Sequence, residues 1–156
     1  MRVVHGDLIQ LALRGEFDVI VHGCNCHCAM YSGVAKGIRA AFPEAHEADE
    51  KTQPGDATKL GTYSAAAVER DGVRLTVVNA YTQFYRRGEG VLADYDAIRS
   101  VFRLIKRDFG GVRIGYPRIG AGLAGGDWNV ISKIIGAELR GEDHTLVEYQ
   151  PRAMST

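Results

Sequence analysis

The sequence lacks any long apolar run, and no stretch approaches the roughly 20 apolar residues that a membrane-spanning helix needs. Its first ten residues, MRVVHGDLIQ, reach charged side chains before a signal-peptide core forms. It also lacks net charge, with 19 basic and 19 acidic residues. A balanced chain has no overall field that attracts nucleic acid or an anionic membrane. We therefore expect a cytoplasmic protein with no membrane partner, whose ligand is a small molecule.

Cysteine is scarce, and the three cysteines, Cys24, Cys26 and Cys28, lie within five positions of one another. An odd, clustered set does not fit the disulfide framework of a secreted domain. A zinc site with His22 and His27 is one alternative, but structural zinc sites usually take a second ligand pair from elsewhere, which this sequence lacks. We predict no metal and no cofactor. Cys24 is interpreted as a small buried apolar residue, with a cysteine–histidine nucleophilic pair as the alternative.

Segments rich in β-branched residues alternate with segments of helical periodicity. Residues 94–108 place Ile98, Val101, Phe102 and Ile105 on one helical face. Two strand-like segments, DVIV and LTVV, are almost continuously apolar, as expected for strands covered by helices on both faces. The length suits one domain, placed at residues 1–150, with a short tail at 151–156. We predict an α/β fold, a three-layer α/β/α sandwich with a central mixed six-stranded sheet. Strands are expected at residues 2–5, 18–22, 62–66, 74–80, 112–116 and 145–149, and helices at 34–42, 44–51, 94–108 and 127–139.

A glycine-rich turn follows the strand-like segment 112–116. Glycine lets backbone N–H groups approach an anion, and the following helix adds about half a positive charge at its N-terminus. The turn therefore predicts a phosphate-binding loop, with a merely flexible connection as the alternative. Gly120, Gly122 and Gly125 also spell G-x-G-x-x-G, and Glu148 ends the next strand, so an NAD(P)-binding oxidoreductase is a further alternative. Against it, the motif lies in the last strand–helix–strand unit instead of the first. The glycines are Gly115, Gly120, Gly122, Gly125 and Gly126.

Residues 21–38 run from an apolar strand through a polar loop into a helix. Together with Gly6-Asp7-Leu8 and the later Ile119-Gly120-Ala121-Gly122, this segment resembles the macrodomain family, which binds ADP-ribose. The resemblance extends from residue 3 to residue 149. His-Gly-Cys-Asn-Cys stands where many macrodomains have Asn-Ala-Ala-Asn, and is similar to the branch of ADP-ribose 1″-phosphate phosphatases and their phage and bacterial relatives. The resemblance implies a protein that binds ADP-ribose or a derivative and hydrolyses ADP-ribose 1″-phosphate or an ADP-ribosylated protein or nucleic acid. Nothing in the sequence demands a partner subunit, so we expect a monomer.

The resemblance also implies roles for individual residues. His22 and Asn25 are the implied catalytic residues: Asn25 holds the distal ribose, and His22 activates water or attacks phosphorus. Asp7, with the adjacent Leu8, is implied in adenine binding, and Tyr149 is a candidate for stacking on that ring. Two loops are implied to bind the diphosphate: Ser32, Gly33, Val34 and Ala35 in the first, and Ile119, Gly120, Ala121, Gly122 and Leu123 in the second.

The sequence departs from the family pattern at two points. The usual three-glycine run is reduced to Tyr31-Ser32-Gly33, and the acid of the lysine-dependent deacylating branch is replaced by Ala124, so hydrolysis by that route is not expected. Asp127 is interpreted as a helix cap, with an approach to the pocket as the alternative.

Several of the other assignments have structural alternatives. Asp7 can instead cap a helix at residues 8–13. His22 can be a hydrogen-bonded structural residue, and the protein can be a non-catalytic reader of ADP-ribose. Tyr81, at the end of a strand, can line the pocket or cover the rim of the core. Arg86, Arg87 and Arg118 are candidates for extra charge at a phosphate site, or are solvated.

Overall fold

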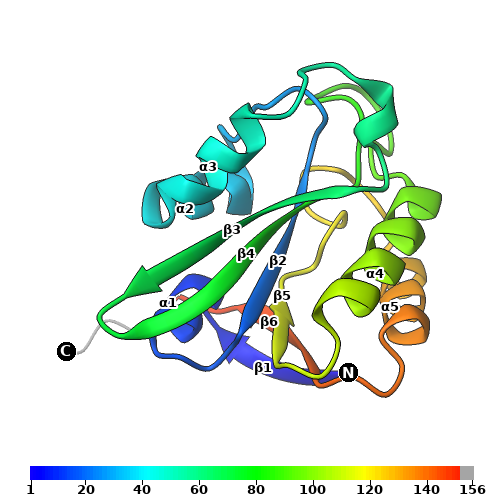
Figure 1. Ribbon diagram of the computed structural model, residues 1–156. Coiled ribbons are helices and arrows are strands. Elements are labelled where there is room, and N and C mark those ends of the chain that lie inside the picture. The colour runs from blue at the N-terminus through cyan, green and yellow to red at the C-terminus, as the bar shows by residue number, and fades with distance from the viewer. Residues whose placement is uncertain (152–156) are drawn as a thin grey trace.

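Residues 1–151 are described in a computed structural model (Figure 1). Six strands form one sheet: β1 (Arg2–Gly6), β2 (Val19–Cys24), β3 (Tyr63–Arg70), β4 (Val73–Tyr81), β5 (Ile114–Tyr116) and β6 (His144–Tyr149). Their order across the sheet is β1-β6-β5-β2-β4-β3. All neighbouring strands are parallel except β3, which pairs antiparallel with β4. The predicted mixed six-stranded sheet is confirmed.

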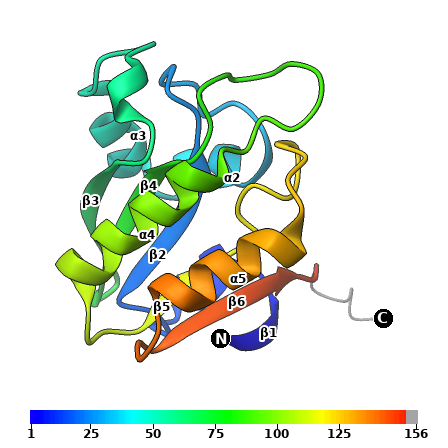
Figure 2. The ribbon, with the colours of Figure 1, turned by 90° about the vertical axis from the view of Figure 1, so that its right-hand side faces the viewer.

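The connections between strands contain the helices. These are α1 (Leu8–Leu13), α2 (Gly33–Ala41), α3 (Pro43–Glu50), the 3-10 turn η1 (Ala57–Lys59), α4 (Tyr95–Phe109) and α5 (Trp128–Glu138). Figure 1 shows α2 and α3 on the opposite side of the sheet from α4 and α5, and Figure 2 shows α4 and α5 side by side on their face. Within residues 1–151, every helix is too short or too polar to span a bilayer. Of the tail predicted at 151–156, residues 152–156 lie outside the described chain.

The two faces of β2 and β4 explain why these strands are nearly continuously apolar. Val21 and Val78 belong to the core cluster under α4 and α5. Ile20 and Val77, one residue away on each strand, belong to the cluster under α1, α2 and α3. Because successive side chains of a strand point to opposite faces, both faces need apolar residues. The predicted apolar face of α4 is confirmed, because its four residues are completely buried: Ile98, Val101, Phe102 and Ile105.

The carboxyl ends of the parallel strands form one edge of the sheet. From this edge β1 leads to α1, β2 to α2, β4 to α4 and β5 to α5. The loops after β4 and β5 contact each other there, since Leu92 N donates to Ala124 O at 2.8 Å. Binding sites of open α/β sheets form at this edge.

Candidate functional site

A cleft of about 250 Å³ opens at the carboxyl ends of β2 and β5. The start of α2 forms one wall and the loop of residues 120–126 forms the other. The walls approach closely, because a Cβ atom built on Gly33 would lie 3.5 Å from Leu123 Cδ1. Within the described chain, no Asp or Glu lines the cleft. Its lining residues are Gly23, Cys24, Asn25, Ala29, Ser32, Gly33, Val34, Ala35, Gln83, Arg86, Pro117, Arg118, Ile119, Gly120, Gly122, Leu123 and Ala124.

The N-terminus of α2 faces this cleft without a side-chain cap. Ser32 occupies the N-cap position, but its hydroxyl makes no capping hydrogen bond. By contrast, α1, α4 and α5 are capped by Asp7, Asp94 and Asp127. The first N–H groups of a helix have no partner within the helix and carry a partial positive charge. This wall of the cleft therefore presents hydrogen-bond donors suited to an anion.

The 120–126 loop presents further backbone donors. It is held closed by two of its own hydrogen bonds, Gly125 N to Gly122 O at 3.0 Å and Gly126 N to Gly120 O at 2.7 Å. Gly120 has a φ of +76°, a conformation that favours glycine. A Cβ on Gly122 would meet no atom within 4 Å, so the loop leaves open space there. Within residues 1–151, no acceptor is paired with the N–H groups of Gly120, Gly122, Leu123 and Ala124.

Asn25 follows the last residue of β2 and lines the cleft. Its Nδ2 donates to Ala29 O at 2.8 Å, and its Oδ1 accepts from His27 N at 2.8 Å. These bonds fix the turn between β2 and α2. Each uses only part of the amide's capacity, since a second N–H and a second lone pair remain. The side chain is therefore pre-organised for a ligand in the cleft.

The side chain of His22 does not line the cleft, and its direct action on the substrate stays a prediction. It is completely buried under α3, and its Nε2 lies 2.6 Å from Asn79 Oδ1. Asn79 in turn donates to Ala45 O of α3 at 2.9 Å. Burial lowers the pKa of His22 to about 4, with the Asn79 hydrogen bond opposing the shift. A neutral ring without exposed surface is a structural hydrogen-bonding group in this conformation.

Cys24 lines the cleft, but its environment does not favour a nucleophile. Its Sγ lies 3.7 and 3.6 Å from His22 Nδ1 and Nε2. These nearly equal distances place the sulfur beside the ring, not in line with one nitrogen. Burial is the largest cause raising the pKa of the thiol, with Asp49 adding to it, so the reactive thiolate is disfavoured. Across residues 1–151, no three His, Cys, Asp or Glu side chains form a group that could hold a metal ion.

The residues predicted to hold adenine lie at the far end of the same sheet edge. Gly6, just before Asp7, pairs with Tyr149 across β1 and β6. Asp7 Oδ1 accepts from Ile9 N at 2.9 Å, so this residue does cap α1. Leu8 is buried in the core, whereas Tyr149 is 75% exposed. None of the three lines the cleft, and their contact with a ligand stays a prediction.

Two curated relatives match most of the chain. An uncharacterized 17.5 kDa protein from the tk-vs intergenic region of Enterobacteria phage T4 is 34% identical over 97% of this chain and 97% of its own length. An ADP-ribose 1″-phosphate phosphatase of Candida albicans is 23% identical over 82% of this chain and 86% of its own length. No family model matches the sequence.

Solved structures show which fold this is. The macrodomain of Mycobacterium tuberculosis DarG superposes with a TM-score of 0.71 at 18% identity, over 96% of this chain and 98% of that one. This chain has the macrodomain fold. A macrodomain of Trypanosoma brucei in complex with ADP-ribose gives a TM-score of 0.66 at 18% identity, over 95% of this chain and 63% of that one.

The macrodomain fold removes the dinucleotide-binding alternative. A Rossmann domain has its glycine motif after the first strand, but here the motif follows β5, the fifth strand along the chain. Glu148 forms an ion pair with Arg118 at 2.6 Å, so its carboxylate is already engaged. Asp127 caps α5 by accepting from Asn129 N at 2.9 Å, as predicted.

Several residues that line this macrodomain's cleft were not among the predicted ligand contacts, including Gly23, Ala29, Gln83 and Pro117. Gly23 has a physical reason to be glycine, because a Cβ there would lie 2.8 Å from Thr82 Oγ1. Arg86 and Arg118, marked only as candidate charges, also line the cleft. Arg87 does not line it. Tyr81 does not either, because its ring is buried and its hydroxyl donates to Asp49 Oδ1 at 2.7 Å.

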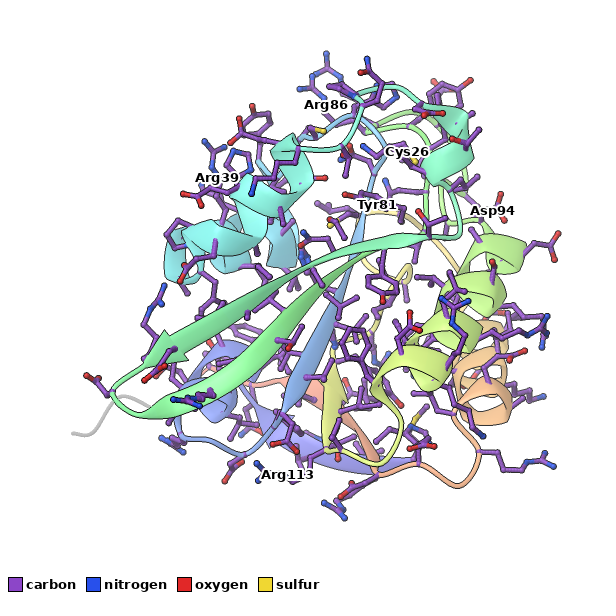
Figure 3. The ribbon with its side chains drawn as sticks, in the orientation of Figure 1. Cys26, Arg39, Tyr81, Arg86, Asp94 and Arg113 are labelled. Atoms are coloured by element: carbon purple, nitrogen blue, oxygen red, sulfur yellow. The ribbon has the colours of Figure 1, made fainter. Side chains whose placement is uncertain are left out.

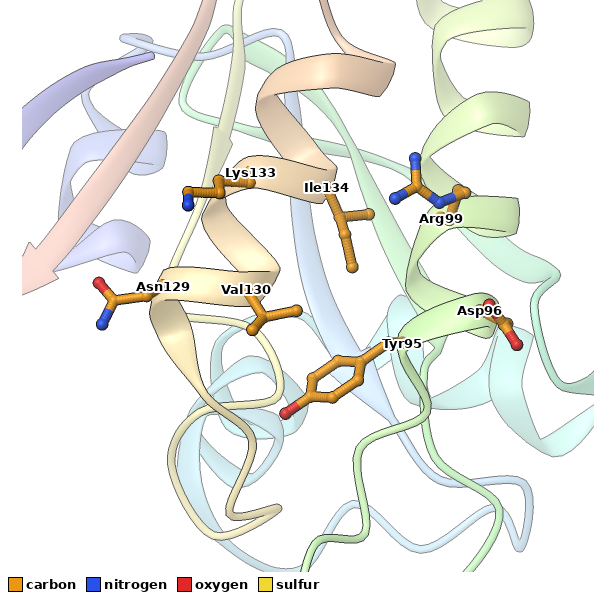
Figure 4. A pocket seen from close by; sticks show the side chains of 7 residues that line it. All are labelled: Tyr95, Asp96, Arg99, Asn129, Val130, Lys133 and Ile134. Atoms are coloured by element: carbon orange, nitrogen blue, oxygen red, sulfur yellow. The ribbon is translucent and has the colours of Figure 1, made fainter.

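A separate hollow of about 420 Å³ lies between α4 and α5 (Figure 4). Figure 4 shows Tyr95 on α4 pointing toward residues of α5, with Asp96 and Arg99 on the same helix. Arg99 forms an ion pair with Glu138 at 3.3 Å. The residues that line this hollow carry charges of both signs, since they include Asp96 and Lys133. The hollow has no glycine loop and no helix N-terminus without a cap, so the cleft beside α2 is the better candidate for an anionic ligand.

Proposed function

We propose that this macrodomain binds ADP-ribose, with the diphosphate between the N-terminus of α2 and the 120–126 loop. The observation that carries the proposal is the pair of facing donor sets, one on an uncapped helix and one on a glycine loop. A diphosphate offers acceptor oxygens to both walls at once. The ADP-ribose complex of the Trypanosoma brucei macrodomain supports this ligand.

The order of the strands supports a direction for the nucleotide. Passing from β2 through β5 and β6 to β1, the sheet edge carries Asn25 first and Asp7 and Tyr149 last. In our proposal Asn25 contacts the distal ribose, and Asp7, Leu8 and Tyr149 hold the adenine. The diphosphate lies between them, on Ser32, Gly33, Val34 and Ala35 and on Ile119, Gly120, Ala121, Gly122 and Leu123.

We further propose that the bound nucleotide is hydrolysed, either as ADP-ribose 1″-phosphate or as an ADP-ribosylated acceptor. The name of the Candida albicans relative supports the first substrate. In the first case water attacks phosphorus, the bond from phosphorus to the ribose oxygen breaks, and ADP-ribose and inorganic phosphate leave. In the second case water attacks the anomeric carbon, the bond from that carbon to the acceptor breaks, and the acceptor leaves with the proton from water. Most of the rate then comes from positioning and from amides that stabilise developing negative charge. Asn25 orients the ribose, and His22 acts as a positioning residue through its strand.

One feature of the cleft favours a second candidate, a non-catalytic reader of ADP-ribose. Among the described residues that line the cleft, there is no acid, lysine or histidine, and the only titratable groups are Cys24, Arg86 and Arg118. General acid–base catalysis normally needs such a group within hydrogen-bonding reach. A reader binds ADP-ribose and releases no product.

Calorimetry with ADP-ribose tests the binding proposal, with NAD as the comparison ligand. Gly122→Val fills the open space beside the loop, so we expect at least a tenfold loss of affinity with an unchanged melting temperature. No measurable ADP-ribose affinity in the wild type would refute the proposal.

Phosphate release from ADP-ribose 1″-phosphate separates enzyme from reader. For the enzyme, we expect Asn25→Ala to lower kcat/KM and His22→Gln to retain part of the activity, because Gln still donates to Asn79. Removal of ADP-ribose from a modified peptide and a modified oligonucleotide is measured in parallel. Absence of turnover on all three, with ADP-ribose still bound, would establish the reader.

A further inference from the structure

Lys59 is a buried lysine that takes no part in the proposed function. Only 7% of its surface is exposed, and lysine is almost never buried unless a carboxylate pairs with it. Within residues 1–151, no acid lies within ion-pair distance of its ammonium group. Its neighbours are instead a carbonyl oxygen, an aromatic ring and a thiol. Nζ donates to Cys26 O at 3.2 Å, lies 4.7 Å from the centre of the Tyr81 ring, and lies 3.6 Å from Cys28 Sγ.

These neighbours gather where β2 and β4 end. Figure 3 shows Cys26 and Tyr81 at the same end of the molecule, and both belong to one small buried cluster. The Tyr81 hydroxyl donates to Asp49 Oδ1 at 2.7 Å, whereas Asp49 Oδ2 is buried without a partner in the described chain. A buried ammonium group and a buried carboxylate thus lie near one ring without pairing with each other.

Several contacts hold the Cys28 sulfur against this cluster. Its thiol donates to Asp49 O of α3 at 3.2 Å, and Thr52 Oγ1 lies 3.4 Å from the sulfur. The backbone of Cys28 has a φ of +55°, which is uncommon for a residue other than glycine. The sulfur therefore has a fixed place between the end of α3 and Lys59 of η1.

Cys28 is also the most accessible of the three cysteines. It is partly exposed and lines a groove of about 480 Å³, whereas Cys24 and Cys26 are buried. Burial raises the pKa of both buried thiols, and oxidants react with the thiolate form. A small oxidant from solvent should therefore react at Cys28 before the other two.

We propose that Cys28 is an oxidation-sensitive site, and that Lys59 closes onto the oxidised sulfur to form a reversible sulfur–nitrogen bond. The oxidant is a peroxide and the product is a sulfenamide. The site gives the buried lysine a role, because the only reactive group beside its nitrogen is this thiol. The proposal is independent of ADP-ribose, so the proposed function can fail in calorimetry while this site stands.

The first step is oxidation of the sulfur. The Cys28 sulfur attacks one oxygen of hydrogen peroxide, the O–O bond breaks, and water leaves. Sulfur loses two electrons to the peroxide and becomes a sulfenic acid.

The second step is condensation with the lysine. Lys59 gives one proton to solvent, which frees the electron pair of its nitrogen for attack on the sulfur. The S–N bond forms, the S–O bond breaks, and the leaving hydroxyl takes another proton from nitrogen and departs as water. The nitrogen already lies beside the sulfur, and a nucleophile held in place reacts far faster than one from solution.

A small thiol in solution reverses the link. The first thiol attacks the Cys28 sulfur and releases the lysine amine, which leaves a mixed disulfide. A second thiol attacks that disulfide, restores the Cys28 thiol and departs in a small disulfide.

Non-reducing mass spectrometry of the wild type after treatment with hydrogen peroxide tests the proposal. We expect the intact protein to lose the mass of two hydrogen atoms, and dithiothreitol to restore the original mass. In a tryptic digest, the peptide that contains Cys28 should be joined to the one that contains Lys59. Cleavage after Lys59 should be lost, because trypsin needs a free lysine side chain.

Variants identify the two partners. Cys28→Ser should abolish the link. Lys59→Gln and Lys59→Arg should each lower the yield of linked protein at least about tenfold, because the held nucleophile is lost, and dimedone should then label the sulfenic acid at Cys28. Lys59→Arg keeps the positive charge, and urea unfolding before oxidation shows that each variant is folded.

The matched control is Lys51→Gln. Lys51 is exposed and follows the last residue of α3, so this variant should form the link like the wild type. Cys26→Ala should also form the link, because the cysteine two positions away is not the partner.

Four results would overturn the proposal. The first is an unchanged mass of the folded wild type under peroxide that oxidises a free cysteine. The second is a sulfenic acid at Cys28 with no link to Lys59. The third is a link that is lost in Cys26→Ala but kept in both Lys59 variants, which would make it a disulfide. The fourth is a bridge that retains the oxygen atom, which would refute the condensation step.

Discussion

The buried imidazole of His22 should make stability depend on pH in a specific window. Its pKa is lowered from 6.5 to about 4 because burial disfavours the charged ring. The unfolded chain therefore binds more protons than the folded chain between about pH 4 and 6.5, and stability rises with pH across that window. A shift of this size corresponds to about 3 kcal/mol. The contribution is fully present above pH 6.5 and is lost as the pH falls towards 4.

Urea unfolding of the wild type and of His22→Gln from pH 4 to 7.5 measures the contribution of the His22 imidazole to the free energy of unfolding. Carboxylates titrate in both proteins, so the difference between the two curves isolates the imidazole. We expect the free energy of unfolding of the wild type to fall by about 3 kcal/mol more than that of the variant between pH 7 and pH 4. Glutamine keeps a donor for Asn79 Oδ1, which limits other losses. Parallel curves would refute the conclusion that the ring is buried and neutral, and would reopen a direct catalytic role.

The loop and the helix that follows it allow two further tests. Gly126→Ala should destabilise the protein by about 1–3 kcal/mol, because the new Cβ would lie 2.5 Å from Gly120 O and the backbone must shift. Its control is Gly136→Ala inside α5, where a new Cβ would meet no atom within 4 Å. This control should raise the free energy of unfolding by about 0.5–1 kcal/mol. Equal urea midpoints for the two variants would contradict the crowding argument. Asp127→Ala should cost about 1 kcal/mol through the lost cap while leaving ADP-ribose affinity unchanged in calorimetry, and a large loss of affinity would place the carboxylate at the ligand instead.

Sequence patterns were sufficient for the layers of this fold because both faces of the central strands need apolar residues. The buried face of α4 was predictable because apolar residues recur with helical spacing along that segment. The cap at Asp127 was predictable because an aspartate stands directly before the helix. The density of glycines likewise predicted a turn at residues 120–126. Its hydrogen bonds join residues three and six positions apart, so the local sequence is enough to indicate it.

The position of His22 depended on tertiary structure. A residue on one face of a strand points toward the ligand, and a residue on the other face points toward a helix. Because side chains alternate, an error of one residue in the strand assignment exchanges the two faces. His22 shares its face with Ile20, under α1, α2 and α3. The cleft contacts of Ala29 and Gln83 arise because two loops from separate strands meet there, which no local pattern records.

The serine at the start of α2 has a consequence for how far this protein can be stabilised. An aspartate at position 32 would supply the cap that three other helices already have, a gain of about 1 kcal/mol. It would also put a fixed negative charge on the amides that, in our proposal, receive the diphosphate. Selection for stability and selection for ligand affinity thus pull this one position in opposite directions. A redesign for stability that adds a capping residue to every helix would therefore place a carboxylate where the diphosphate is proposed to bind, and the protein's own side chain would compete with the ligand.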